Sequence, residues 1–244
     1  MRFLRVNPIT LKEQLYKALS IVALVAYYVP ILLVLFKKLW KDTPILMFSF
    51  YWVAGGLINL IQFITAIPQP VRALITVIYN LLDVPFVLLI LYLNTNVQII
   101  KKVTRLLIPV YLFIEIMNGI LRGFTDESFK YFLAIGVLIV IVTMICEIFH
   151  YFQNMDSTDR EKATIFLHFA VLFEYASYVI FYIFQYILKE YSKDKMVDNE
   201  IIYYASTLLG VLIACFGFLS NNLKKKIPAQ QVPRPHEVLI SIID

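Results

Sequence analysis

The sequence contains few charged residues: Lys, Arg, Asp and Glu make up 16% of its 244 positions. Soluble domains carry about 25% charged residues, so this chain has too few to cover the outside of a soluble globule. Hydrophobic residues make up 60% of the chain, and the mean hydropathy is +0.76. These values exclude a soluble enzyme and a disordered chain, and they indicate an integral membrane protein.

Cysteine and glycine are also scarce, with two and seven residues. Cys146 and Cys215 fall within apolar runs, which excludes a disulfide framework and favours packing roles. Few glycines argue against the broken helices of many transporters. The sequence has no Gly-x-Ser-x-Gly motif and no phosphate-binding loop, so we expect a protein that is not an enzyme.

Seven apolar runs can cross a membrane, which takes about 20 residues per helix. They cover residues 18–36, 44–67, 73–93, 106–121, 131–152, 163–188 and 201–220, and every Lys and Arg lies outside them. The runs do not alternate in polarity, which favours helices over barrel strands. The expected fold is therefore all-α: a polytopic membrane protein built as a seven-transmembrane-helix bundle.

Two short segments flank the expected membrane domain, residues 18–223. Residues 1–17 are expected to form a lead or an interfacial helix, and residues 224–244 a basic, Pro-containing tail. With seven spans the termini lie on opposite faces, and twelve Lys and Arg fall on the C-terminal face against ten on the other. The positive-inside rule then predicts a cytoplasmic C-terminus in the cell membrane. Basic residues that flank spans indicate the lipid bilayer as partner, and not nucleic acid.

Four acidic residues lie inside the predicted spans, at Asp83, Glu115, Glu147 and Glu174. A charge at the bilayer centre costs at least about 2.5–3.5 kcal/mol, so each acid is a candidate functional group. All but Glu147 lie near the middle of their spans, where no Lys or Arg shares their depth.

Helical spacing predicts that these mid-span acids belong to a polar seam in the bundle interior. Residues three or four apart share a helix face, and through Asn118 the Glu115 carboxyl could reach Arg122. The expected members are Asp83, Glu115, Glu174, Tyr79, Asn80, Tyr111, Asn118 and Tyr178. Such a seam could carry protons or a cation, hold a small polar or lipid ligand, or only fix helix packing through interhelical hydrogen bonds.

A second cluster is predicted at one end of the bundle. Glu147 and His150 are three residues apart on one helix, and His168 lies at matching depth on the next. These groups could hold a metal ion or respond to pH. Hydrogen bonds from Thr164 and Tyr151 could equally satisfy the imidazoles. The sequence has no second Glu-x-x-His, which argues against a di-iron site.

The last span carries a stripe of small residues: Ser206, Gly210, Ala214 and Gly217. Such stripes let helices approach closely. The stripe is expected to pack against a neighbouring helix of the same chain, with a homodimer or another membrane subunit as the alternative.

Span 201–220 has no lysine for a retinal Schiff base, so retinal is excluded and no cofactor is expected. Three stretches, YNLLDVP at 79–85, FIEIMN at 113–118 and YVIFYIF at 178–184, give the chain a resemblance to small bacterial seven-helix membrane proteins. The resemblance covers about residues 18–220. It implies a seven-helix bundle and brings no activity and no site residues.

These features predict a non-enzymatic sensor or a protein that couples to a partner in the membrane. A small transporter or a proton or cation channel that uses the buried acids is the first alternative. A structural subunit of a larger membrane complex is the second.

Overall fold

The computed structural model describes residues 8–153, 159–183 and 193–220, and every regular element within them is helical. Seven helical segments in these ranges are long and apolar enough to cross a membrane. The expected all-helical class and the number of such segments are therefore confirmed. The elements are α1 (Pro8–Ala26), α2 (Val29–Phe36), the 3₁₀ turn η1 (Leu39–Lys41), α3 (Thr43–Phe63), α4 (Gln69–Asn94), α5 (Gln98–Arg122), α6 (Asp126–Gln153), α7 (Asp159–Tyr182) and α8 (Lys193–Ser220). The expected tail at 224–244 lies outside the described residues.

Several helices begin earlier than the expected spans. Helix α5 begins at Gln98, whereas the apolar run begins at residue 106. Lys101, Lys102 and Arg105 are too polar to belong to the apolar run, but they are good helix formers and lie inside the helix. Helix α4 begins at Gln69 and not at residue 73, since Pro70 occupies the first turn, where no N–H is required.

The first apolar segment is not one helix, as expected for 18–36, but two, with a break at Tyr27 and Tyr28. Pro30 lies in the first turn of α2 and has no N–H to bond the carbonyl of Ala26, so the α1 ladder cannot continue through it. At the break, the Tyr27 side chain enters the bundle and is 2% exposed. Its ring and Cβ lie against α3 at Gly55 and Gly56, where any added Cβ would approach Tyr27 atoms to 3.0 and 2.7 Å.

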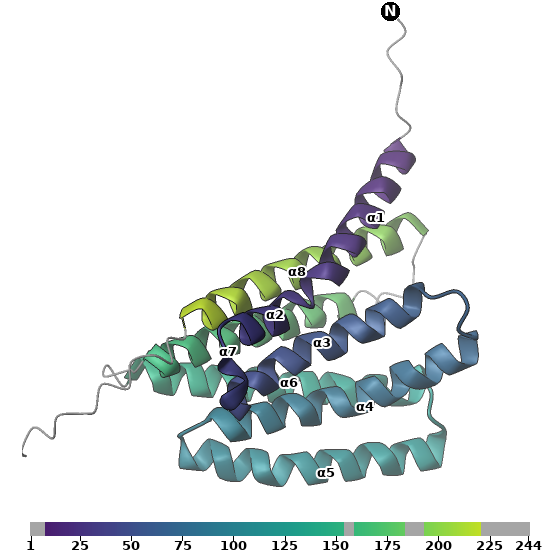
Figure 1. Cartoon of the computed structure of the whole chain (residues 1–244). Coiled ribbons are helices and arrows are strands. Elements are labelled where there is room, and N and C mark those ends of the chain that lie inside the picture. The colour runs from purple at the N-terminus through teal and green to yellow at the C-terminus, as the bar shows by residue number, and fades with distance from the viewer. Residues whose placement is uncertain (1–7, 154–158, 184–192, 221–244) are drawn as a thin grey trace, which may run out of the picture.

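The helices form a closed ring in which neighbours along the chain pack together. Helix α8 runs beside α7 and also contacts α1 and α2, which closes the ring, and α6 also contacts α4 (Figure 1). The N-terminal part of α1 projects beyond the other helices. Large side chains fill the interior, including Trp52, Phe48, Leu88, Met144 and Leu167.

The outside of the bundle is apolar. Phe36 is 82% exposed, Leu121 76% and Ile99 74%, and exposed Leu, Ile, Val and Phe side chains occur on every described α-helix. Lys37 marks one end of this surface: its ammonium group donates to the carbonyl oxygens of Phe218 and Leu219 at the end of α8, and partial burial lowers the pKa of Lys37. A cation at this position complements the negative end of a helix dipole.

The small-residue stripe of α8 faces helices of the same chain. A Cβ added to Gly217 would lie 3.0 Å from the carbonyl oxygen of Ala163 and 3.0 Å from Leu167, both in α7. A Cβ on Gly210 would lie 3.3 Å from the Trp52 ring of α3. Ala214 is fully buried, and Ser206 lines the cavity described below.

Asp42 joins the start of α3 to the start of α7. Its carboxylate accepts a capping bond from the backbone N–H of Ile45 at 3.4 Å and two bonds from the Arg160 guanidinium at 2.8 and 3.1 Å. The Arg160 side chain is 51% exposed, so solvent screens the ion pair.

We expect Arg160→Gln to lower the free energy of unfolding by less than about 1 kcal/mol, the usual limit for an exposed ion pair. Asp42→Ala removes the helix cap as well and should cost about 1–2 kcal/mol. Unfolding of the detergent-solubilised variants, followed by tryptophan fluorescence, measures both. Equal losses would show that the cap adds nothing to the pair.

Candidate functional site

A cavity of about 70 Å³ lies inside the bundle, between α3, α4, α6, α7 and α8. A buried water needs about 10–15 Å³ measured this way, so the cavity has room for a few waters or one small molecule. We call it the interior cavity. Its lining residues are Tyr51, Tyr79, Asn80, Asp83, Leu133, Glu174, Tyr175, Ser177, Tyr178, Tyr203, Ser206 and Thr207.

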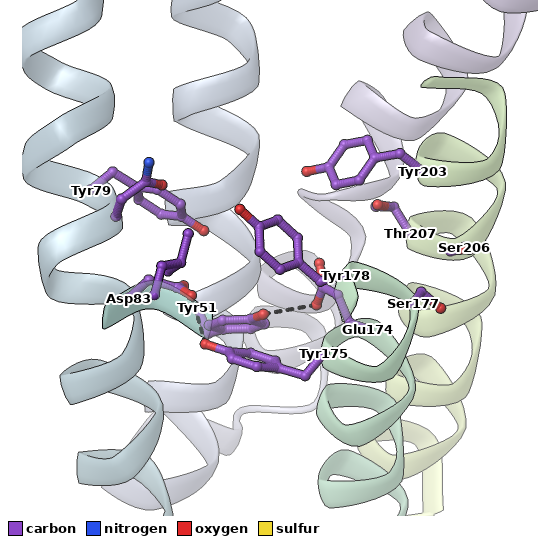
Figure 2. Close-up of a pocket in the computed structure, with 12 residues that line it drawn as sticks. Tyr51, Tyr79, Asp83, Glu174, Tyr175, Ser177, Tyr178, Tyr203, Ser206 and Thr207 are labelled. Carbon is purple, nitrogen blue, oxygen red and sulfur yellow. Dashed lines mark hydrogen bonds between the residues drawn. The ribbon is translucent and has the colours of Figure 1, made fainter. Parts of the chain in front are cut away.

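Two hydrogen bonds cross the interior cavity and hold its carboxyl groups in place (Figure 2). The Tyr51 hydroxyl of α3 donates to Glu174 Oε2 of α7 at 2.9 Å. The Tyr175 hydroxyl of α7 donates to Asp83 Oδ2 of α4 at 2.6 Å. Because Glu174 and Tyr175 are consecutive in α7, that helix is tied to α3 through one residue and to α4 through the next. Each bond leaves further lone pairs on its carboxyl group.

The lining of the interior cavity is acidic and aromatic. It includes two carboxyl groups and five tyrosines, and none of the described residues that line it is Lys, Arg or His. Carboxyl and phenol oxygens accept hydrogen bonds, and tyrosine faces attract cations. An arrangement of this kind favours a ligand with a positive charge or with several hydrogen-bond donors.

The break in the first segment is linked to the interior cavity. The Tyr27 hydroxyl lies 3.3 Å from the hydroxyl of Tyr203 and 3.5 Å from Thr207 Oγ1, and both partners line the cavity. Asn59 of α3 donates to the same Tyr27 oxygen at 3.5 Å. A change at Tyr203 or Thr207 therefore reaches the junction between α1 and α2 through direct contacts.

The predicted seam is divided between two places. Five of its members, Asp83, Glu174, Tyr79, Asn80 and Tyr178, line the interior cavity. The other three, Tyr111, Glu115 and Asn118, are buried residues of α5 that are not among those lining the described cavities.

Contacts with α6 account for two of those three side chains. The Tyr111 hydroxyl donates to the Phe132 carbonyl at 2.9 Å, and the Asn118 amide donates to the Ser128 carbonyl at 2.7 Å. The expected relay from Glu115 through Asn118 to Arg122 is therefore wrong, because the Asn118 amide instead fastens α5 to the start of α6.

The second predicted cluster lines a separate cavity of about 200 Å³. This end cavity lies where α4 leads into α5 and α6 leads into α7, and its lining includes Glu147, His150 and His168. Thr95 donates to Glu147 Oε2 at 2.6 Å and accepts from the Val97 N–H at 3.0 Å, so the carboxyl is fixed to the α4–α5 connection.

Within the described residues, no group of three or more His, Cys, Asp and Glu side chains is placed to hold a metal ion. The metal interpretation of Glu147, His150 and His168 is therefore not supported. His168 is fully buried beside the Phe48 ring, at 5.5 Å between ring centres, and neither of its ring nitrogens has a hydrogen-bond partner in the described part of the chain. The predicted bond from Thr164 is wrong, because the Thr164 hydroxyl donates to the Arg160 carbonyl of its own helix.

Several cavity residues were not predicted from the sequence. Tyr51, Tyr175, Tyr203 and Thr207 lie at the interior cavity, and Ser206 was expected only in helix packing. Tyr175 directly follows Glu174, a position that helical spacing assigns to a different face. With 16 tyrosines in the chain, residue type alone could not select the five that meet at the cavity.

Comparison of the chain with protein-family models, with curated proteins and with solved structures finds no match. The evidence on function is therefore the geometry of the two cavities. Judged by their described lining residues, only the interior cavity combines two carboxyl groups from separate helices with no basic side chain.

Proposed function

We propose that the chain is a multi-pass protein of the cell membrane that binds a small cationic ligand in the interior cavity and acts as a sensor. Support for a membrane location comes from the seven apolar segments and from the apolar outer surface. In water, exposed apolar patches of this extent cause association, whereas lipid tails solvate them. The excess of basic residues on the C-terminal face supports a cytoplasmic C-terminus.

The observation that carries the ligand class is the pairing of Asp83 and Glu174 across a cavity whose described lining has no basic residue. A cation placed between them would be attracted to both carboxylates and could donate hydrogen bonds to them, and the surrounding tyrosine faces add cation–π attraction. It would also compensate the cost of keeping two acids in a membrane interior.

The contacts of Tyr27 support a sensing role over simple storage. A ligand that displaces Tyr203 or Thr207 changes the hydrogen bonds at the break between α1 and α2. The break separates α1, whose N-terminal part projects from the bundle, from α2, so the tilt of α1 can respond to a ligand in the interior cavity. Such coupling requires that the ligand prefer one of the two arrangements.

Binding of tetramethylammonium to the purified protein tests the proposal. We expect Asp83→Asn and Glu174→Gln each to weaken binding about tenfold, which corresponds to the loss of one charge–charge attraction of roughly 1.4 kcal/mol. Glu115→Gln is the matched control, because it neutralises a buried acid outside the cavity and should leave binding unchanged. Calorimetric titration in a nonionic detergent gives the affinities. Absence of measurable binding to the unaltered protein, or equal losses in all three variants, would refute the cationic-ligand assignment.

Proton or cation conduction is a second candidate, favoured by one observation. Helix α7 lines both cavities: His168 lines the end cavity, and Tyr175, two helical turns further along, lines the interior cavity. Leu167 and Val171, which lie on either side of His168 in α7, are buried in the core together with Phe48. Flux into proteoliposomes separates the two functions, since a sensor moves no net ions and a conductor does.

A further inference from the structure

An apolar groove of about 420 Å³ opens on the outside of the bundle between α3, α4 and α5. Its surface is almost wholly apolar, and its lining includes Ala54, Leu82, Phe86, Ile108 and Leu112. Leu82 is 49% exposed on this side, so the groove faces the surroundings of the bundle directly. In the proposed membrane setting, those surroundings are lipid chains.

The groove and the interior cavity share a wall. Tyr51, Tyr79 and Asp83 are counted in the lining of both. Tyr51 is 5% exposed, whereas Tyr79 and Asp83 are partly exposed. Asp83 therefore lies between the apolar groove, which opens on the outside of the bundle, and the polar interior cavity.

We infer that the ligand is a single-chain cationic amphiphile, which enters from the bilayer with its apolar chain in the groove and its ammonium head at Asp83 and Glu174. This inference rests on the proposed function, since it assigns an apolar chain to the same cation. Charge complementarity identifies the head, because the described residues of the shared wall and of the cavity behind it include carboxyl groups and no basic side chain. The apolar groove identifies the chain.

The two parts of the ligand contribute differently. Lipid tails are as apolar as the groove, so moving the chain from bilayer to groove yields packing contacts and little hydrophobic gain. The chain instead concentrates the ligand in the membrane and aligns it with the groove, while the head supplies the attraction to the acids. A neutral amphiphile of the same chain length should therefore bind weakly, and an anionic one should be excluded.

The test compares two probes that share one head group, tetramethylammonium and dodecyltrimethylammonium, on the full chain in dodecyl maltoside micelles. We expect the long-chain probe to bind more tightly. Ala54→Phe fills the groove and should weaken binding of the long-chain probe about tenfold, a loss typical of a steric clash in a fitted site. Binding of tetramethylammonium should not change. Ala176→Phe, the same substitution at an exposed position of α7 that lines neither the interior cavity nor the groove, should leave both probes unaffected.

Ile108→Trp is a second groove variant, used if Ala54→Phe does not yield folded protein by gel filtration. Equal binding of the two probes, or no effect of either groove variant on the long-chain probe, overturns the inference while the cationic-ligand proposal stands. If neither probe binds the unaltered protein, the proposed function itself fails. Tighter binding of dodecyl sulfate than of dodecyltrimethylammonium would also overturn the inference.

Discussion

Gly136→Leu is expected to prevent assembly of the bundle, with a loss of at least about 4 kcal/mol, which is comparable to the whole stability of many domains. Gly136 lies in α6 at its crossing with α4 and α5. A Cβ placed there would meet the Tyr111 hydroxyl and would lie 2.7 Å from Tyr111 Cζ and 2.8 Å from Val84 Cγ2. Contacts this short do not occur in relaxed packing, so at least one helix must move.

The Tyr111 ring cannot move aside at low cost. Tyr111 is 5% exposed, and its hydroxyl is bound to the Phe132 carbonyl of α6 at 2.9 Å. For the smaller change Gly136→Ala, the gain in helix propensity is about 1 kcal/mol. Against it stand overpacking, at about 1–3 kcal/mol, and loss of the hydrogen bond, at about 1 kcal/mol. The cost exceeds the gain, so even alanine should destabilise the bundle.

Gel filtration and thermal unfolding in detergent measure the outcome. Ile135→Phe is the control, because it adds volume at the preceding position, which is 52% exposed. Tyr111→Phe removes the atom closest to the clash, so in the Gly136→Ala background it should cost less than it does alone, and a double-mutant cycle reports that difference. A folded, fully stable Gly136→Leu protein would contradict the close approach of α4, α5 and α6.

Hydropathy alone was sufficient to predict the helical class and the seven apolar segments, because a run of apolar residues long enough to cross a bilayer is a property of the local sequence. It was less reliable at helix ends. Lys101 and Arg105 precede the apolar run that begins at 106, yet they lie inside α5. In the first segment, Pro30 interrupts the helix although the apolar run looks continuous. Pro30 was visible in the sequence, and its missing N–H is the signal that could have predicted the break.

Which acids share a cavity was not predictable, because depth along a helix says nothing about rotation or about which helices touch. Asp83, Glu115 and Glu174 were expected at one level and in one seam. Asp83 of α4 and Glu174 of α7 lie on opposite sides of the interior cavity (Figure 2), whereas α5 packs against α4 and α6. Tyr51 and Tyr175 complete the site from positions that a one-helix pattern cannot relate to the acids.

Replacing Glu115 by leucine is expected to stabilise the protein by about 2 kcal/mol, in the range reported when buried polar groups without partners are removed. Glu115 is 1% exposed, and its Oε2 atom has no hydrogen-bond partner among the described residues. The neighbouring donors are committed to α6: Tyr111 gives its hydroxyl proton to Phe132, and the Asn118 amide bonds Ser128. Asp83 and Glu174 each accept a hydrogen bond from a tyrosine hydroxyl, at 2.6 and 2.9 Å, whereas the buried Oε2 atom of Glu115 carries a desolvation cost without such a bond.

Unfolding in mixed micelles of sodium dodecyl sulfate and a nonionic detergent measures the change, with Glu115→Gln as a control that keeps the shape and a polar head. The glutamine variant should gain less than the leucine variant, because its amide still lies buried and needs partners. Tetramethylammonium binding should stay unchanged in both. A loss of stability above about 1 kcal/mol in Glu115→Leu would mean that the carboxyl makes a net favourable hydrogen bond, for instance to an internal water. The stability change thus decides whether the Glu115 carboxyl is a net cost to the fold, and unchanged tetramethylammonium binding would leave Asp83 and Glu174 as the acids of the proposed site.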